Sequence, residues 1–237
     1  MTITLSELKR TLGDLSAADL ECIADWLETR VEDARYRTHH VRGAQSQCTP
    51  EEPIFMTWEE YLAFEEQSPY RHEYVNGAVY AMSYESLAHN RIAQALISQL
   101  LPHLRGSPYQ PYFLQAKVEI RAGGDELMYY PDAVIACQLQ DLQSQVVRNP
   151  TLVVEILSKS TYHIDRREKA LNYQRAETVE EYVLIEPSHP RIIVYRRAEG
   201  WRPKLYAGTT TSLDLRSIQL SIPLEQIYAT ELPVQSS

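Results

Sequence analysis

Two acidic residues, Asp132 and Glu155, stand where a carboxylate is unusual. Glu155 lies inside the apolar run of residues 151–157 (Thr-Leu-Val-Val-Glu-Ile-Leu), which has the length and β-branched composition of a buried strand. Asp132 opens a second strand-like run directly after Pro131. An ionised carboxylate in a buried strand costs several kcal/mol unless a cation, a metal or a dense set of hydrogen bonds compensates it. Two such acids therefore indicate either a metal site or a structural ion pair.

The metal alternative has a specific chemistry. Mg²⁺ prefers oxygen ligands and is commonly bound by one or two carboxylates, with water and phosphate completing its coordination. Asp132 and Glu155 meet that need if their strands are neighbours. Such a cation polarises a phosphodiester and makes a bound water more acidic, and a nearby lysine could orient that water or neutralise charge in the transition state.

The elements that would position these residues follow from hydrophobic periodicity and turn residues. Thr57-Trp58-Glu59-Glu60 has the form of a capping box that opens a short helix. Residues 72–82 predict a β-hairpin around Asn76-Gly77, and residues 86–104 predict an amphipathic helix with one apolar face. The other expected elements are strands at 112–121, from 132, at 151–157, 182–185, 191–195 and 204–206, a Gly123-Gly124 turn, a polar connection at 138–149 and a helix at 163–176. Strands on both sides of a crossover helix predict an α/β or α+β domain with a mixed central sheet flanked by helices.

Residues 1–53 are expected to lie outside this domain, which then comprises residues 54–237. Leucines and other apolar residues at spacings of three and four predict an αα-hairpin over residues 1–35. Residues 36–53 are polar and contain proline, as in a linker. The narrow apolar stripe of the hairpin must pack on the main domain or on another copy of the chain.

Composition narrows the classes of protein. No apolar stretch approaches the roughly 20 residues of a membrane span. Three scattered cysteines and an N-terminus without a secretory pattern favour the cytoplasm. The net charge of −9 argues against a protein coated in basic surface for non-specific nucleic-acid binding. Residues 158–175 are nevertheless rich in basic side chains, and this cluster is either a local basic groove or a solvated helix face. Its members are Lys159, Arg166, Arg167, Lys169 and Arg175.

The order of motifs over residues 55–197 resembles a known family. The motifs are His72-Glu73-Tyr74-Val75-Asn76-Gly77, Met82 through Ala88-His89-Asn90, Tyr130-Pro131-Asp132, the run from Pro150 to Ser158, Ser160-Thr161, Asp165, Lys169, Tyr173 and Glu181-Tyr182. Together they resemble the PD-(D/E)XK nuclease superfamily and, within it, the Uma-type branch of putative restriction endonucleases. The resemblance implies a restriction-endonuclease-like core and a Mg²⁺-dependent endonuclease acting on DNA, with Mn²⁺ as a substitute metal. It also implies that Asp132 and Glu155 are the metal ligands.

One position departs from the superfamily pattern, which places a lysine two residues after the second acid. Here that position is Leu157. Uma-type relatives carry a lysine on the following helix instead, and Lys169 matches it. Lys159 is the alternative, because it lies on the Glu155 face if the strand continues. Asp165 stands four residues before Lys169 and could pair with it on a helix, in competition with a catalytic use.

Two further residues are candidate auxiliaries. Glu73 matches an acid that such nucleases often carry near their first helix or hairpin, where it binds metal through water; the alternative is an exposed hairpin carboxylate. His89 shares a helical face with Ile92 and Leu96, so it is either a partly buried structural histidine or a catalytic group. Tyr173, one helical turn after Lys169, is expected to pack on the sheet.

Two hypotheses for function result. The first is a metal-dependent DNA endonuclease in which metal-activated water attacks in line and leaves a 5′-phosphate, as the resemblance implies. A homodimer is expected in that case, because cutting both strands usually needs two sites. The second is a non-catalytic, nuclease-derived binding or assembly protein that uses the N-terminal helices for interaction. The absence of lysine at position 157 and the acidic net charge both favour the second hypothesis.

Overall fold

The computed structural model describes residues 54–82, 85–113, 115–137, 143–158 and 165–228. The helical hairpin predicted over residues 1–35 and the linker predicted over residues 36–53 lie outside the described residues and stay predictions. Within the described ranges, no helix has the length and apolar character that a membrane crossing needs.

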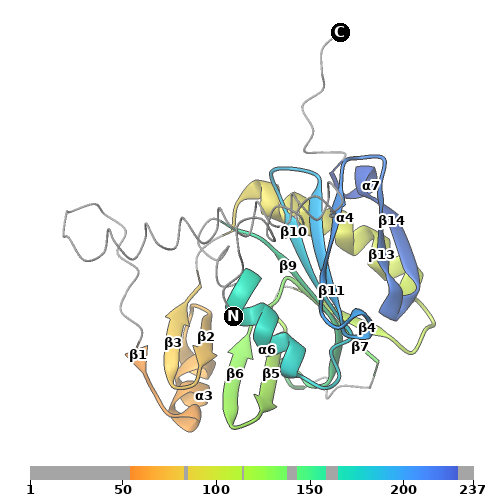
Figure 1. Ribbon diagram of the computed structural model, residues 1–237. Helices are drawn as coiled ribbons and strands as arrows, with labels where there is room; N and C mark the ends of the chain where they lie inside the picture. The colour runs from red at the N-terminus through yellow and green to blue at the C-terminus, as the bar shows by residue number, and fades with distance from the viewer. Residues whose placement is uncertain (1–53, 83–84, 114, 138–142, 159–164, 229–237) are drawn as a thin grey trace, which may run out of the picture. The chain divides into compact units, whose positions relative to one another are not determined.

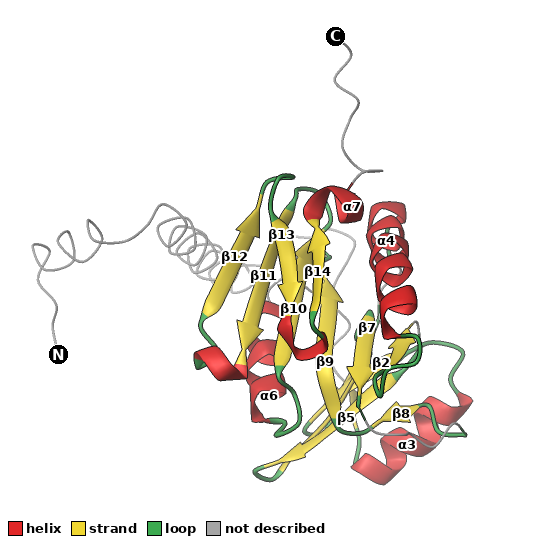
Figure 2. Cartoon of the chain, turned by 90° about the vertical axis from the view of Figure 1, so that its right-hand side faces the viewer, coloured by secondary structure: helices red, strands yellow, loops and turns green. Residues whose placement is uncertain are grey.

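Two six-stranded sheets and one two-stranded ribbon make up the β-structure (Figures 1 and 2). In spatial order, the first sheet contains β1 (Ile54–Phe55), β3 (Ala78–Ala81), β2 (His72–Val75), β6 (Asp125–Tyr129), β5 (Lys117–Ala122) and β8 (Val146–Val147). The second contains β12 (Pro203–Ala207), β11 (Arg191–Arg196), β10 (Glu181–Glu186), β9 (Pro150–Ile156), β7 (Ala133–Ala136) and β4 (Gln110–Phe113). The ribbon pairs β13 (Ser212–Leu215) with β14 (Leu220–Pro223). Both sheets mix parallel and antiparallel pairs, which confirms the predicted mixed α+β fold, although the strands form two sheets rather than one central sheet.

Two helices begin at residues that cap their N-termini. Helix α3 (Trp58–Gln67) starts at the predicted capping box, in which the Thr57 side chain accepts from the Glu60 amide and the Glu60 side chain accepts from the Thr57 amide. Helix α4 (Leu87–Leu104) follows the N-cap Ser86 and buries Ile92, Leu96 and Leu100, as its periodicity predicts. The remaining helical segments are the π-helix η1 (Asp165–Lys169), α6 (Ala170–Arg175), α7 (Leu224–Tyr228) and the 3₁₀ turns η2 (Arg197–Glu199) and η3 (Arg216–Ile218).

The predicted β-hairpin is formed by β2 and β3. Asn76 and Gly77 have φ angles of 48° and 96°, the left-handed backbone that a two-residue hairpin loop needs at both positions. The register pairs Val75 with Ala78 and, further along, Glu73 with Tyr80. Glu73 therefore sits in the middle of a short strand that also pairs with β6 on its other side.

The single strand predicted over residues 112–121 is wrong, because the chain changes sheets there. Strand β4 pairs with β7 in the second sheet, whereas β5 pairs with β6 in the first. The break is a turn in which the amide of Gln115 donates to the carbonyl of Phe113, and neither glycine nor proline marks it in the sequence. Gly123-Gly124 is the turn of the β5–β6 hairpin, and β6 itself was not predicted. The predicted connection at 138–149 likewise contains the short strand β8.

The two faces of β9 enter different parts of the core. Leu152, Val154 and Ile156 join the apolar cluster beneath α4, while Val153 and Leu157 join the cluster that contains Ala170 and Tyr173 of α6. Helices α4 and α6 thus cover opposite faces of the second sheet (Figure 1). By alternation, Glu155 points to the α6 side, like Val153 and Leu157.

Candidate active site

Asp132 and Glu155 are brought together by the antiparallel pairing of β7 and β9. Ala133 is the register partner of Val154, so Asp132, one residue earlier, stands opposite Glu155, one residue later. The backbone amide of Ile156 donates to Oδ2 of Asp132 over 2.7 Å, which ties the acid to the neighbouring strand. The Glu155 side chain is 5% exposed and that of Asp132 is 21% exposed. One carboxylate is therefore enclosed and the other reaches towards solvent.

Lys169 extends from the end of η1 into this site. Its Nζ donates to Oε1 of Glu155 over 3.2 Å, although the side chain comes from the crossover between β9 and β10 rather than from β9 itself. The same nitrogen lies 2.8 Å from Oε1 of Glu73 and 3.1 Å from Oδ1 of Asp165. Leu157, which stands where the superfamily pattern has a lysine, is buried in the core under α6. The structure thus places Lys169 beside the second acid, whereas the alternative, Lys159, lies outside the described residues.

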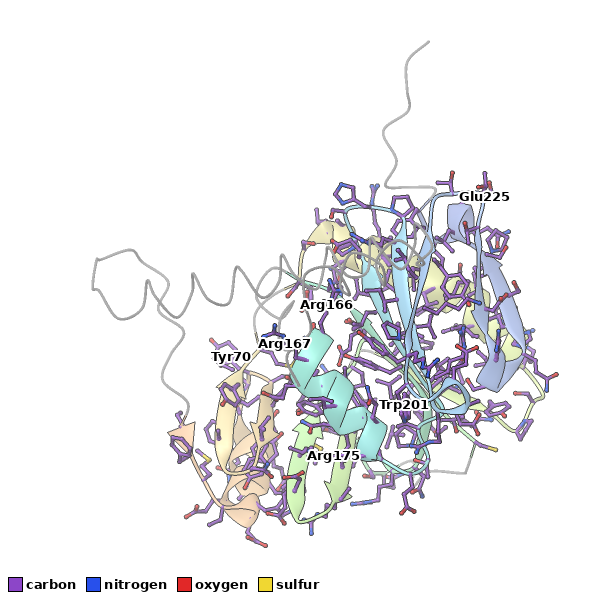
Figure 3. The ribbon with its side chains drawn as sticks, in the orientation of Figure 1. Tyr70, Arg166, Arg167, Arg175, Trp201 and Glu225 are labelled. Atoms are coloured by element: carbon purple, nitrogen blue, oxygen red, sulfur yellow. The ribbon has the colours of Figure 1, made fainter. Side chains whose placement is uncertain are left out.

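Asp165 and Lys169 stand at the two ends of one π-helical turn and face the same site. The sequence predicted a helix over residues 163–176, and the described part of it begins as the π-helix η1 before continuing as α6. Asp165 and Lys169, at its two ends, are both buried and form the ion pair expected from their spacing. Single π-turns inside helices often occur at functional sites. Figure 3 shows Arg166 and Arg167 at one end of this helical segment and Arg175 at the other.

The described members of the basic cluster at residues 158–175 point in different directions. Lys169 points inward, and Arg175 pairs with Asp125 at 2.5 Å on the exposed side. Arg166 and Arg167 are half-buried.

Three carboxylates compete for one buried ammonium. Burial raises the pKa of Glu155 well above its usual range; Lys169 opposes that rise, while Asp165, Asp132 and Glu73 add to it. Burial also raises the pKa of Glu73, against the influence of Lys169. Burial alone would lower the pKa of Lys169, but Glu155, Glu73 and Asp165 together raise it well above its ordinary value. Lys169 is therefore a permanent cation, and the fully ionised cluster carries excess negative charge.

His89 reaches Asp132 from helix α4, which covers the face of the second sheet opposite α6. Its Nε2 lies 2.7 Å from Oδ1 of Asp132, and its Nδ1 lies 3.0 Å from Oε2 of Glu85. Burial would lower the pKa of His89, but the neighbouring carboxylates of Asp132 and Glu85 raise it to about 9. The side chain is 5% exposed, so it is buried as expected and also reaches the predicted site. Glu85 was missed from sequence; its only signal was the i,i+4 spacing to His89.

Tyrosine side chains close the site on the α6 side. Tyr173 packs within the core, as predicted, and its hydroxyl lies 3.5 Å from Oε1 of Glu155. Burial raises the pKa of the Tyr173 phenol well above its usual value, so the phenol stays neutral. The backbone amide of Tyr130 donates to Oε1 of Glu73 over 3.2 Å, which fixes that carboxylate beside Lys169. Glu73 is consequently a buried member of the site and not an exposed hairpin carboxylate.

The donor set suits a hard divalent cation. No group of three or more His, Cys, Asp or Glu side chains in the described ranges is arranged as a ready-made metal cage. Mg²⁺, however, uses one or two carboxylates and keeps several waters, and the Asp132–Glu155 pair offers two. The excess negative charge around Lys169 is of the sign that a cation would neutralise. The described partners of Glu155 all meet Oε1.

Comparison with known proteins places this arrangement in a family context. The sequence matches the family Uma2, described as "Putative restriction endonuclease", over residues 58–226. It is 32% identical over 173 residues to the uncharacterized protein slr1290 of Synechocystis sp., covering 72% of this chain and 90% of that protein. It is 29% identical over 145 residues to the uncharacterized protein sll1609 of the same organism, covering 60% and 81%. The fold is similar to the crystal structure of a putative nuclease belonging to DUF820 from Anabaena variabilis, with a TM-score of 0.63 at 14% identity over 75% of this chain and 99% of that one.

Proposed function

The chain belongs to the Uma2 family of putative restriction endonucleases, and from that premise we propose that it is a Mg²⁺-dependent endonuclease that hydrolyses phosphodiester bonds in DNA. The observation that carries the proposal is the convergence of Asp132, Glu155 and Lys169 at one end of the β7–β9 strand pair. Glu155 is reached by the Lys169 ammonium at 3.2 Å and lies opposite Asp132 in the strand register. The crystal structure of similar fold is itself described as a putative nuclease, which supports the same reaction class.

Each residue has a separate task in this proposal. Asp132 and Glu155 would hold the cation, with Mn²⁺ able to replace Mg²⁺. The cation, when bound, polarises the phosphate and makes a water molecule more acidic. Lys169 provides a fixed positive charge beside Glu155, suited to stabilise the negative charge that grows on the phosphate oxygens. Glu73 and Asp165 hold the Lys169 ammonium from its other sides.

One argument for the competing hypothesis, a non-catalytic binding or assembly protein, was that position 157 carries leucine instead of lysine. The approach of Lys169 to Glu155 weakens that argument, because a lysine from the crossover segment occupies the neighbourhood of the second acid. The acidic net charge still favours the non-catalytic hypothesis.

Plasmid nicking tests the proposal. The purified full-length protein should convert supercoiled plasmid to the open-circular form with Mg²⁺ or Mn²⁺ but not with EDTA. Asp132→Asn and Glu155→Gln should each lower the rate at least about 100-fold, a typical loss when a charge-stabilising group is removed. Glu181→Gln is the matched control, since Glu181 is a buried carboxylate that pairs with Arg196 at 2.6 Å outside the site. Nicking that persists in Asp132→Asn would refute the assignment, and a folded protein that neither binds metal nor nicks DNA would favour the non-catalytic alternative.

A homodimer is part of the proposal, because cleavage of both strands of a duplex requires two such sites. Sedimentation analysis of the full-length protein should give the mass of a dimer. A monomer that still makes double-strand breaks at low enzyme concentration would overturn this part.

A further inference from the structure

The orientation of the Asp132 carboxylate depends on donors from two elements that are distant in sequence. Asp132 precedes β7, and an aspartate there could rotate about its side-chain bonds unless it is held. Strand β9 supplies the Ile156 amide to Oδ2, and helix α4 supplies Nε2 of His89 to Oδ1, each at 2.7 Å. Both oxygens of the carboxylate therefore have a defined partner.

His89 is itself held by two contacts besides the one to Asp132. Its backbone amide donates to the Oγ of the N-cap Ser86 over 3.2 Å, which fixes the start of α4. Its Nδ1 lies 3.0 Å from Oε2 of Glu85, so the ring has a carboxylate at each nitrogen. With a side chain 5% exposed, the ring has little room to rotate. Such a residue can transmit a fixed orientation to Asp132.

We propose that His89, oriented by Glu85, is a positioning residue that holds the Asp132 carboxylate facing Glu155. The inference rests on the proposed function only in its consequence for metal binding. Residues that hydrogen-bond to metal ligands usually change metal affinity by 10–100-fold when they are removed. His89 therefore acts on the cation through Asp132 and makes no contact with substrate.

The test separates the position of Asp132 from the binding of metal. Selective ¹⁵N-isoleucine labelling gives a metal-free reporter, because the Ile156 amide donates directly to Asp132. His89→Phe keeps a ring but removes the donor, whereas His89→Gln retains an N–H at similar reach. His103→Phe is the control, since His103 lies on the same helix but its Nε2 meets the carbonyl of Ile218 at 2.8 Å.

In EDTA, His89→Phe should shift the Ile156 amide resonance and speed its hydrogen exchange, as Asp132→Asn does, while His89→Gln and His103→Phe leave it near the wild-type position. With Mn²⁺, titration calorimetry should show an affinity about 10–100-fold lower for His89→Phe and within about threefold of wild type for His89→Gln. An unchanged Ile156 amide in a folded His89→Phe protein would overturn the inference. So would an unchanged Mn²⁺ affinity in that variant. If the amide shifts but the wild-type protein binds no Mn²⁺, the positioning role stands and the proposed metal-dependent function fails.

Discussion

Replacing Glu155 by glutamine should make the metal-free protein more stable while abolishing its activity. The carboxylate attracts the Lys169 ammonium at 3.2 Å, which is worth about 5 kcal/mol at an effective dielectric constant of about 20. The same ammonium lies 2.8 Å from Glu73 and 3.1 Å from Asp165, so each of their contacting oxygens is at most about 6 Å from that of Glu155. Each repulsion is then at least about 2.6 kcal/mol, and the two together match the attraction.

The desolvation of Glu155 is consequently left without compensation, in agreement with its raised pKa. Glutamine has nearly the same shape, keeps an oxygen to accept from Lys169 and carries no charge to desolvate. We expect Glu155→Gln to raise the free energy of unfolding by about 1–2 kcal/mol at pH values above the folded pKa of Glu155, because surplus charge at a functional site commonly trades stability for activity. That gain corresponds to a rise in Tm of about 2–8 °C for a domain of this size.

The pH dependence has a defined sign. Because the pKa of Glu155 is raised in the folded state, folded wild-type protein takes up this proton before the unfolded chain does. The wild-type protein is therefore less stable than Glu155→Gln at pH values above the folded pKa of Glu155, and this difference in stability disappears as the pH falls through that pKa. The difference in Tm should therefore be largest at alkaline pH and should narrow as the pH falls through the raised folded pKa of Glu155.

Thermal unfolding followed by circular dichroism in EDTA measures the effect. Glu181→Gln is the control of opposite sign, because Glu181 accepts from Arg196, from the amides of Arg216 and Ser217 and from the Ser217 hydroxyl. Losing those charge-assisted bonds should lower stability by at least about 2 kcal/mol. If Glu155→Gln is destabilised across the whole pH range in the same way as Glu181→Gln, the reasoning about surplus charge is refuted.

Three other perturbations test different contacts of the site. Lys169→Met removes the cation that three carboxylates share and should lower the free energy of unfolding by about 3–5 kcal/mol near neutral pH. The loss of Tm should be smaller at acidic pH, and equal losses at both pH values would contradict the ion-pair argument. Mn²⁺ at about 100 times its Kd should stabilise the wild-type protein by about 2.7 kcal/mol but leave the Tm of Asp132→Asn unchanged. Equal stabilisation of both proteins would show that the metal binds elsewhere. Tyr173→Phe should leave the nicking rate within about threefold of wild type, because its hydroxyl lies 3.5 Å from Glu155, at the outer limit of a hydrogen bond; a loss of more than about 100-fold would make the phenol part of the chemistry.

Features encoded in short stretches of sequence were predictable. The capping box at Thr57, the Asn76-Gly77 turn and the apolar face of α4 each depend on residues within one or two turns of each other. The buried strand around Glu155 also followed from local composition. Asp132 was likewise marked by the strand-like run that it opens, and the family resemblance added Lys169 with Lys159 as the alternative.

Contacts between distant segments were decided by the tertiary structure alone. The strand register set Asp132 opposite Glu155, and the hairpin brought Glu73 to Lys169, where it could equally have faced solvent. The division into two sheets at Gln115 had no local signal, since a strand can exchange partners without glycine or proline. Sequence periodicity specifies which side of an element is apolar, but it does not specify which element covers that side. The sequence therefore determined the pair of acids, and packing determined that a buried lysine and a histidine would hold them.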